Sequence, residues 1–388
     1  MSDTVKAIPT ETTIRDDSTA TLISFELSQK TWVVTIRRPD SERMSRHSVK
    51  AGDLAALTTL LARQRPKAAG VAGAPLRLVT IHEAGLDGFW LHRWLCAQGI
   101  ESHVVDAASI AAPRRKRRAK SDGIDGETLL RTLAAWRRGE PRVCSMVVPP
   151  SAEDEDRRRI VRERDRLVDE RTALTNRING LLVNQGITGY RPLKRDRHTR
   201  LEAMRTGDGR PLPVRLQAEI ERMLERLELL LRQIRQVEAE RDRLLAAAKQ
   251  AAPTAALALL PMLCAIGPEI AATLALECFT RSFGNRRQIA AFAGLAPTPW
   301  RSGSINHEQG VKGGGQPSLR ELMIEAAWAW LRYQPDSELS RWFHAKVGSA
   351  KGRARRVAIV AVARKLLVAL WRYVTQGELP AGAKLKAA

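Results

Sequence analysis

An alternation of short apolar runs and turns occupies the chain from residue 20 to about residue 105. Residues 22–27 and 31–36 are β-prone and have three polar residues between them, which predicts two antiparallel strands joined by a tight turn. A third strand is predicted near 44–49. Further elements are expected at 54–63 (helix), 76–81 (strand), 88–98 (helix) and 102–105 (strand). This order predicts an α/β domain with a mixed sheet.

The limits of this domain follow from composition. Residues 1–19 are polar and show no apolar periodicity, so we expect a flexible tail there. Residues 122–137 have the apolar spacing of a helix, and the two prolines Pro149 and Pro150 mark the end of the domain. We therefore expect the α/β domain at residues 20–150.

Long helical periods follow this domain. Residues 153–183 are rich in Arg and Glu and carry apolar residues on one face. Over residues 216–237 the apolar positions advance by alternate steps of four and three, the spacing of a coiled-coil seam, until Arg241 interrupts it. This spacing fits an intramolecular helical hairpin and an intermolecular coiled coil equally well. We expect a coiled-coil region over residues 151–250, with the Gly-, Pro- and Arg-rich residues 186–213 as its loop.

The remaining residues, 251–388, are predicted to be mainly helical. Gly267 and Pro268 indicate a tight turn between two helices. Such a turn is either a helix-hairpin-helix that aims backbone N–H groups at a phosphate or a plain helix break. The Gly- and Ser-rich residues 294–315 are expected to form a long loop, and loops of that length are usually functional or disordered. Helices are then expected at 319–332, 337–346 and 355–375.

The charge balance of the chain is strongly positive. Its 388 residues carry 64 Lys and Arg against 42 Asp and Glu, a formal net charge of +22. Such an excess repels itself unless a polyanion neutralises it, so nucleic acid is the expected partner. An anionic membrane is the alternative partner, but the sequence has no run of about 18 uninterrupted apolar residues. The best candidate, residues 357–371, contains Arg364 and Lys365.

Two further features of the sequence bear on location. The polar start of the chain has no apolar signal-peptide core, so we expect a cytoplasmic, nucleoid-associated protein with no membrane partner. Four widely spaced cysteines form no Cys-x-x-Cys pair and have no histidine at zinc-finger spacing: Cys96, Cys144, Cys264 and Cys278. This argues against a disulfide framework and against a structural zinc site.

Four acidic residues stand where a hard cation could bind. Glu26 ends the first predicted strand, and Glu83 follows the strand at 76–81. Asp122 and Asp125 lie three residues apart, on one face at the start of a helix. Carboxylate oxygens from different elements suit Mg²⁺ or Mn²⁺, and two such ions can clamp the oxygens of a phosphodiester under attack. This arrangement is typical of an RNase H-like domain, although each residue taken singly could instead form a surface ion pair or a helix cap.

A basic run lies directly before Asp122. Its six positive side chains would attract a phosphate backbone, and binding through them would weaken steeply with salt. Because the run abuts the predicted acidic site, we favour nucleic-acid binding over a solvated run of charge. The residues are Arg114, Arg115, Lys116, Arg117, Arg118 and Lys120.

Four segments of the sequence resemble those of one known family. They cover residues 83–93, 104–110, 117–126 and 294–303. In this order they resemble the corresponding phrases of the insertion-sequence 110 (IS110) transposases. The resemblance extends over nearly the whole chain from about residue 20.

The resemblance implies a transposase or recombinase that cuts and rejoins DNA to move an insertion sequence. It implies a RuvC-like domain of RNase H fold in which the four acidic residues above bind metal. A coiled-coil spacer and a helical serine domain would follow, and Ser302 would attack the phosphodiester. Lys312 lies in a lysine motif after this serine, and we assign it to nucleic-acid binding with the basic run. The implied partners are target and donor DNA, a structured non-coding guide RNA and further copies of the chain in a dimer or tetramer.

Two positions depart from the family pattern. The first acidic residue is usually Asp and here is Glu26, and the lysine motif usually ends in Asn where this chain has Gln316. Ser304 is the alternative to Ser302 as nucleophile. Asp87 and Asp106 lie in family-like segments and are interpreted as supporting or structural residues, with a position of Asp106 closer to the metal as the alternative.

Two other classes of function remain open on the sequence alone. A junction-resolving or repair nuclease would use the acidic residues and would not need Ser302. A non-catalytic nucleic-acid-binding protein would need neither.

Overall fold

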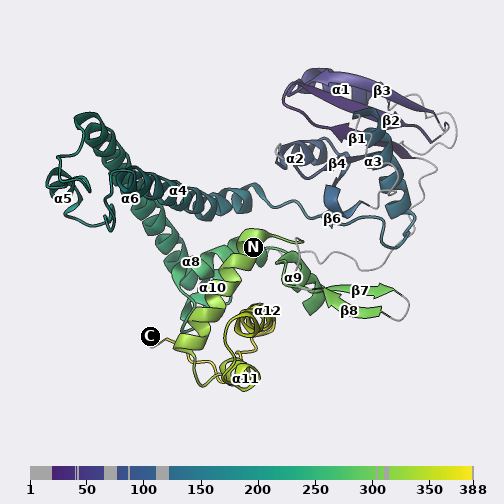
Figure 1. Cartoon of the computed structure of the whole chain (residues 1–388). Helices are drawn as coiled ribbons and strands as arrows, with labels where there is room; N and C mark the ends of the chain where they lie inside the picture. Colours follow the sequence, from purple (N-terminus) through teal and green to yellow (C-terminus); the bar gives the residue numbers. More distant parts are fainter. Residues whose placement is uncertain are drawn as a thin grey trace. The chain divides into compact units, whose positions relative to one another are not determined.

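A computed structural model describes two compact units of the chain, Met1–Pro150 and Ser151–Ala388 (Figure 1). The described residues are 20–39, 41, 43–64, 77–85, 88–110, 122–302, 305–309 and 314–386. At 122–124, 298–302 and 305–309 the description covers the backbone alone. Among all these residues no single helix is long and apolar enough to cross a membrane. One pair bent by 108°, Val214–Ala251 with Ala256–Met262, reaches that length and composition only jointly.

The first unit is built on a mixed sheet, as the sequence predicted. The described residues of this unit form six strands: β1 (Ala20–Glu26), β2 (Thr31–Arg37), β3 (Met44–Lys50), β4 (Arg77–Glu83), β5 (Glu101–Val105) and β6 (Met146–Val147). They lie in the order β3-β2-β1-β4-β5-β6. β4 pairs in parallel with both β1 and β5, and the other neighbours pair antiparallel. The tight turn between β1 and β2 is closed by Ser28, whose hydroxyl donates to the Thr31 carbonyl at 2.6 Å.

Helices cover both faces of this sheet. One core joins α1 (Leu54–Ala62) and α2 (Trp90–Ala97) to strand residues that include Ile23, Phe25 and Val34. The other core joins α3 (Asp122–Arg137) to strand residues that include Leu22, Val79 and Ile81. Because successive strand residues point to opposite faces, the even-numbered positions of β1 face α3. A short 3₁₀ turn, η2 (Ala107–Ser109), follows β5.

The second unit begins with a helical hairpin. Its helices are α4 (Ala152–Val183), α5 (Arg197–Glu202) and α6 (Val214–Ala251), with α5 near the tip in Figure 1. Ile178 and Leu182 of α4 share a buried core with Ile220 and Leu227 of α6. The seam residues at this end therefore pack within the chain. For them the structure shows the intramolecular helical hairpin and not the intermolecular coiled coil. Pairing between chains stays a prediction.

The interruption of the seam at Arg241 has a structural cause. Only 9% of the Arg241 side chain is exposed, and its Nη1 donates to Glu269 Oε2 in α8 (Pro268–Thr273) at 2.7 Å. Arg164 of α4 contacts the same carboxylate oxygen at 2.8 Å. The apolar seam thus gives way to charged residues where both hairpin helices are tied to the C-terminal helices by ion pairs.

The rest of the second unit packs around one apolar core. Its other elements are α7 (Ala256–Leu259), η4 (Leu260–Met262), the π-helical turn η5 (Leu274–Cys278), α9 (Arg286–Phe292), β7 (Thr298–Ser302), β8 (Ile305–Gln309), α10 (Pro317–Tyr333), α11 (Glu338–Val347) and α12 (Arg353–Gln376). Trp330 of α10 is fully buried in this core with Leu366 and Leu370 of α12. Its indole donates to the Ser337 hydroxyl at 2.9 Å. The three predicted helices in this part are confirmed.

The expectation of a long loop at 294–315 is wrong, because β7 and β8 form an antiparallel hairpin within it. The two ends of this segment meet. Gly294 and Gly315 have φ values of 62° and 76°, and a Cβ on Gly315 would lie 2.6 Å from Gly294 Cα. The Gln316 N–H donates to the Phe292 carbonyl at 2.9 Å just outside. We call this closure, formed by Gly294 and Gly315, the glycine neck.

Candidate active site

Two of the predicted metal ligands lie side by side at the ends of parallel strands. In the register of the parallel pair β1 and β4, Ser24 is opposite Ile81 and Phe25 is opposite His82. Glu26 and Glu83 therefore occupy the next pair of opposite positions. Residues that lie opposite each other in paired strands point to the same face of a sheet. Both carboxylates therefore start from the face that α3 covers. Glu26 is half-buried, with Oε1 closed off from solvent, and Glu83 is exposed.

The start of α3 lies against Glu26. The Ser24 hydroxyl donates to the Gly126 carbonyl at 2.9 Å, and this bond is buried. A Cβ on Gly126 would lie 2.9 Å from Glu26 Oε1, so a side chain at this position would displace the carboxylate. Asp125 is the neighbouring residue and is half-buried. The chain thus brings Glu26, Glu83 and the turn that carries Asp125 to one edge of the sheet.

The fourth predicted ligand, Asp122, is the first residue of α3, and only its backbone is described. Among the side chains that the structure does describe, no group of three or more His, Cys, Asp or Glu is arranged to hold a metal ion. The four-carboxylate metal site therefore stays a prediction. What supports it is the shared face and level of Glu26 and Glu83, together with the approach of α3.

The other acidic residues and the basic run have separate outcomes. Asp106 caps the 3₁₀ turn after β5, because its Oδ1 accepts from the Ala108 N–H at 3.0 Å. Asp87 lies outside the described residues. The basic run at 114–120 and Lys312 lie outside them as well, so their binding to nucleic acid stays a prediction.

Ser302 belongs to the β7–β8 hairpin, which lies between the two glycines of the neck in the chain. It is the last residue of β7, where it is level with Ile305 of β8, so it lies at the end of the hairpin that is far from the neck. Only its backbone is described, and Ser304 lies outside the described residues. The structure thus places the predicted nucleophile at a projecting end of the second unit.

The chain matches known proteins along nearly its whole length. A family described as Transposase IS116/IS110/IS902 matches residues 257–340, which run from α7 to α11 and include both strands of the hairpin. A protein of Sinorhizobium fredii that is named as a transposase, y4rJ, is 54% identical over an alignment of 387 residues that covers 97% of each chain. The chain belongs to the IS116/IS110/IS902 family of transposases. The transposase for insertion sequence element IS1111A of Coxiella burnetii is 27% identical over 316 residues, 79% of this chain and 80% of that one.

Membership of this transposase family accounts for the charge of the chain. DNA transposition requires cleavage and rejoining of DNA strands, and DNA is the polyanion that a net charge of +22 calls for. The acidic residues at the edge of the sheet and the serine on the hairpin are the groups whose chemistry fits this activity.

The transposase also contains a buried histidine that the sequence pattern did not reveal. His82 follows Ile81 in β4 and points to the opposite face, towards α2. Neither of its ring nitrogens has a hydrogen-bond partner among the described residues. Burial, with a smaller contribution from His92, lowers the pKa of His82 to about 4. His82 is therefore neutral near pH 7 and has no part in the acidic edge.

Proposed function

We propose that this transposase cuts and rejoins DNA with a divalent cation, Mg²⁺ or Mn²⁺, held by four carboxylates, and with Ser302 as nucleophile. The carboxylates are those of Glu26, Glu83, Asp122 and Asp125. The observation that carries the proposal is that Glu26 and Glu83 lie opposite each other, on one face of two parallel strands.

The sheet supports an RNase H-like, RuvC-like identity for the first unit. β1 lies between antiparallel β2 and parallel β4, and β5 extends the sheet in parallel beyond β4. Acidic residues then stand at the ends of adjacent parallel strands and at the start of the helix that covers them. A bound cation would stabilise negative charge on the phosphate and on the departing oxygen.

The chemistry of the four proposed ligands suits such a cation. Carboxylate oxygens are the preferred ligands of Mg²⁺ and Mn²⁺. Gly126 leaves the space that the Glu26 carboxylate occupies, which offsets the extra methylene of Glu over Asp at this position. Glu83 is exposed beside it, so a phosphate can approach from solvent. Glu26 and Glu83 would both hold the cation through their carboxylate oxygens.

Ser302 would perform the exchange of strands. Its Oγ forms a new ester bond to the phosphorus as the bond from phosphorus to the departing sugar oxygen breaks. The serine proton leaves, and the departing oxygen takes up a proton. The number of phosphate ester bonds is unchanged, so the reverse reaction with another strand rejoins the DNA without any further energy source.

The first test separates metal binding from serine chemistry. Purified Glu83→Gln and Asp125→Asn should bind Mn²⁺ about tenfold more weakly or worse, as measured by electron paramagnetic resonance. Asp53→Asn is the matched control. Asp53 caps α1, on the other face of the sheet, by accepting from the Ala56 N–H at 2.9 Å, so its change should leave the affinity intact. Equal Mn²⁺ affinity in all variants would exclude the metal site.

The second test concerns the nucleophile. Ser302→Ala should abolish the covalent protein–DNA adduct on denaturing gels, whereas Ser304→Ala should retain it. The opposite result would assign the attack to Ser304. Metal-dependent cleavage by Ser302→Ala without any adduct in the unaltered protein would favour the junction-resolving or repair nuclease.

We also infer that a structured non-coding RNA guides this transposase and that it works as a dimer or tetramer. The resemblance to the IS110 transposases and the large positive charge support the RNA partner. Exposed apolar residues of α6, such as Val214 and Leu229, support contact between chains. Recombination should stop after RNase treatment, and light scattering should give a multiple of 43.1 kDa. Full activity after RNase, or a monomeric mass at working concentration, would refute these two inferences.

A further inference from the structure

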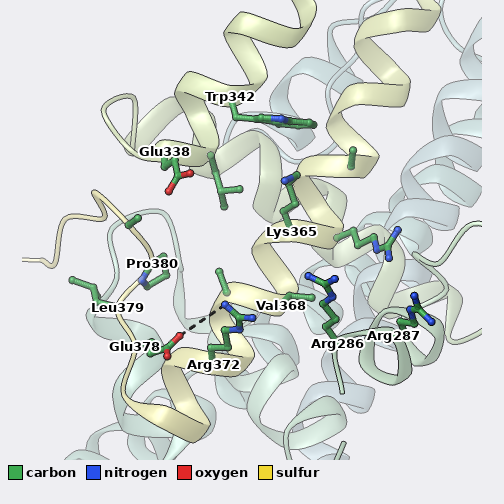
Figure 2. A pocket seen from close by; sticks show the side chains of 15 residues that line it. Arg286, Arg287, Glu338, Trp342, Lys365, Val368, Arg372, Glu378, Leu379 and Pro380 are labelled. Carbon is green, nitrogen blue, oxygen red and sulfur yellow. Dashed lines mark ion pairs between the residues drawn. The ribbon is translucent and has the colours of Figure 1, made fainter. Parts of the chain in front are cut away.

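A basic pocket of about 670 Å³ lies in the second unit among α9, α11, α12 and the chain after α12 (Figure 2). Its walls carry cations from two turns of α12 and from the start of α9. Figure 2 shows Lys365 reaching up to the underside of Trp342, and Arg372 turned towards Glu378. The five cationic residues are Arg286, Arg287, Arg364, Lys365 and Arg372.

One face of α12 packs on the apolar core, and the other face lines the pocket. Leu366, Leu367 and Leu370 of this helix belong to the apolar core of the unit. Lys365 and Val368 lie on the other side and line the pocket. The helix carries six cationic and no acidic residues. The charges that interrupt the apolar run of this helix in the sequence are thus part of the pocket.

The cations of the pocket are largely uncompensated. Two carboxylates line it, and Glu378 contacts Arg372 at 3.9 Å. Arg286, Arg364 and Lys365 form no ion pair with any residue that the structure describes. Lys365 Nζ lies 4.8 Å from the centre of the Trp342 ring, which orients it by a cation–π contact. Unpaired cations grouped in a concave site concentrate positive potential and attract an anion.

The shape and lining of the pocket point to more than a single phosphate. Its volume is that of a site for a small organic molecule, for which about 300–1,000 Å³ is usual. Leu339, Val368 and Ala369 provide apolar surface beside the cations. A nucleotide combines an anionic phosphate with an apolar base face. A base within a duplex is paired and stacked, so an unpaired nucleotide is the form that can enter.

We propose that this pocket binds an unpaired nucleotide of a nucleic-acid strand, with its phosphates on the cations and its base against the apolar wall. The proposal rests on DNA transposition, in which a cut strand must be held until it is rejoined. It does not depend on the metal site or on Ser302, because none of the pocket residues belongs to either.

The experiment uses the full chain, EDTA in place of metal, and labelled oligonucleotides of one length. Single-stranded DNA, single-stranded RNA and duplex DNA are compared by fluorescence anisotropy. The test variant is Arg286→Gln with Lys365→Gln, two exposed residues whose change should not disturb folding. The matched control is Arg353→Gln with Arg356→Gln, which removes the same charge from the exposed start of α12 outside the pocket.

We expect the test variant to lose about tenfold in affinity for a single strand, or about 1.4 kcal/mol. The slope of log affinity against log salt should fall by about 1.4, because the two substituted side chains no longer neutralise phosphates. Affinity for duplex DNA should change by less than about threefold. Its paired bases cannot enter the pocket, so it loses only general electrostatic attraction to the two side chains. A loss on DNA alone or on RNA alone supports the proposal and identifies the strand that is bound.

Three results would overturn the proposal. They are an unchanged affinity for single strands, an equal loss for duplex DNA, and an equal loss in the control variant. The last would show that only the overall charge matters. Circular dichroism of both variants confirms the fold independently of binding. Because metal and cleavage are absent from the assay, failure of the metal or serine chemistry leaves its outcome unaffected.

Discussion

The close packing of α3 on β1 makes Gly126→Ala a sharp test of how the acidic edge is assembled. A Cβ at this position would lie 2.9 Å from Glu26 Oε1 and 3.2 Å from Thr35 Cβ, and it would run into Thr35 Oγ1. Thr35 is only 1% exposed. Its β-branched side chain has little freedom to rotate away. Either α3 or the strands must therefore move to admit the methyl group.

The magnitude follows from two opposing contributions. At an open helical position, Gly→Ala raises the free energy of unfolding by about 1 kcal/mol. Overpacking a buried site lowers it by about 1–3 kcal/mol. We expect Gly126→Ala to be destabilised by about 1 kcal/mol as the balance of the two. Gly180 of α4 is the matched control, because a Cβ there would have no atom within 4 Å. Gly180→Ala should be stabilised by up to about 1 kcal/mol.

Urea denaturation measures the free energy of unfolding of both variants, and Mn²⁺ titration reports whether the acidic edge has moved. The same change in a Thr35→Ala background removes the main clash, so the coupling energy between the two positions should be about 1–3 kcal/mol. If Gly126→Ala stabilised the protein as much as Gly180→Ala does, the close approach of α3 to β1 would be refuted.

Three further predictions concern other parts of the fold. Gly315→Ala should open the glycine neck and reduce the yield of the covalent DNA adduct by about tenfold or more, because the nucleophile is displaced, while circular dichroism stays unchanged; full adduct yield would contradict it. The unfolded chain protonates His82 below pH 6.5, and the folded chain does so only near pH 4. Stability should therefore fall by about 2 kcal/mol between pH 7 and pH 5. Urea titrations of His82→Leu at both values should lack this loss. Arg241→Leu restores the apolar seam but leaves Arg164 as the remaining ion-pair partner of Glu269 among the described residues, so it should destabilise by about 2 kcal/mol. Glu269→Gln should recover part of this, and a more stable Arg241→Leu would show that the ion pair is dispensable.

The acidic edge was largely predictable from the sequence because its signals are local. The strands that end at Glu26 and Glu83 are short apolar runs bounded by polar residues, so their positions and ends are visible in the pattern. The sequence did not predict that the two strands are neighbours, because β4 pairs with β1 and not with β3, the strand that precedes it in the chain. The space left by Gly126 was not predictable, since it depends on contact between residues 100 positions apart in the sequence.

The hairpin of Ser302 and the basic pocket were missed for the opposite reason. Glycines and prolines around residues 294–315 favour a loop locally, whereas the glycine neck is formed by residues about twenty positions apart. Arg286 and Lys365 come together only because α9 and α12 pack on one core. No pattern along a single helix reveals such a meeting. Arg364 and Lys365 look like interruptions of an apolar run when the helix is considered alone.

The glycine neck gives the serine-bearing segment a modular character. Because its two ends touch, the segment leaves the core and returns to it at one point, and the helices on either side need not move if its length changes. The entropy cost of closing such a segment grows only with the logarithm of its length, by about 0.6 kcal/mol for each doubling. Insertions, deletions or a transplanted hairpin between residues 294 and 315 should thus be tolerated by the scaffold. An engineer can vary the nucleophile's reach there while leaving the helical core untouched.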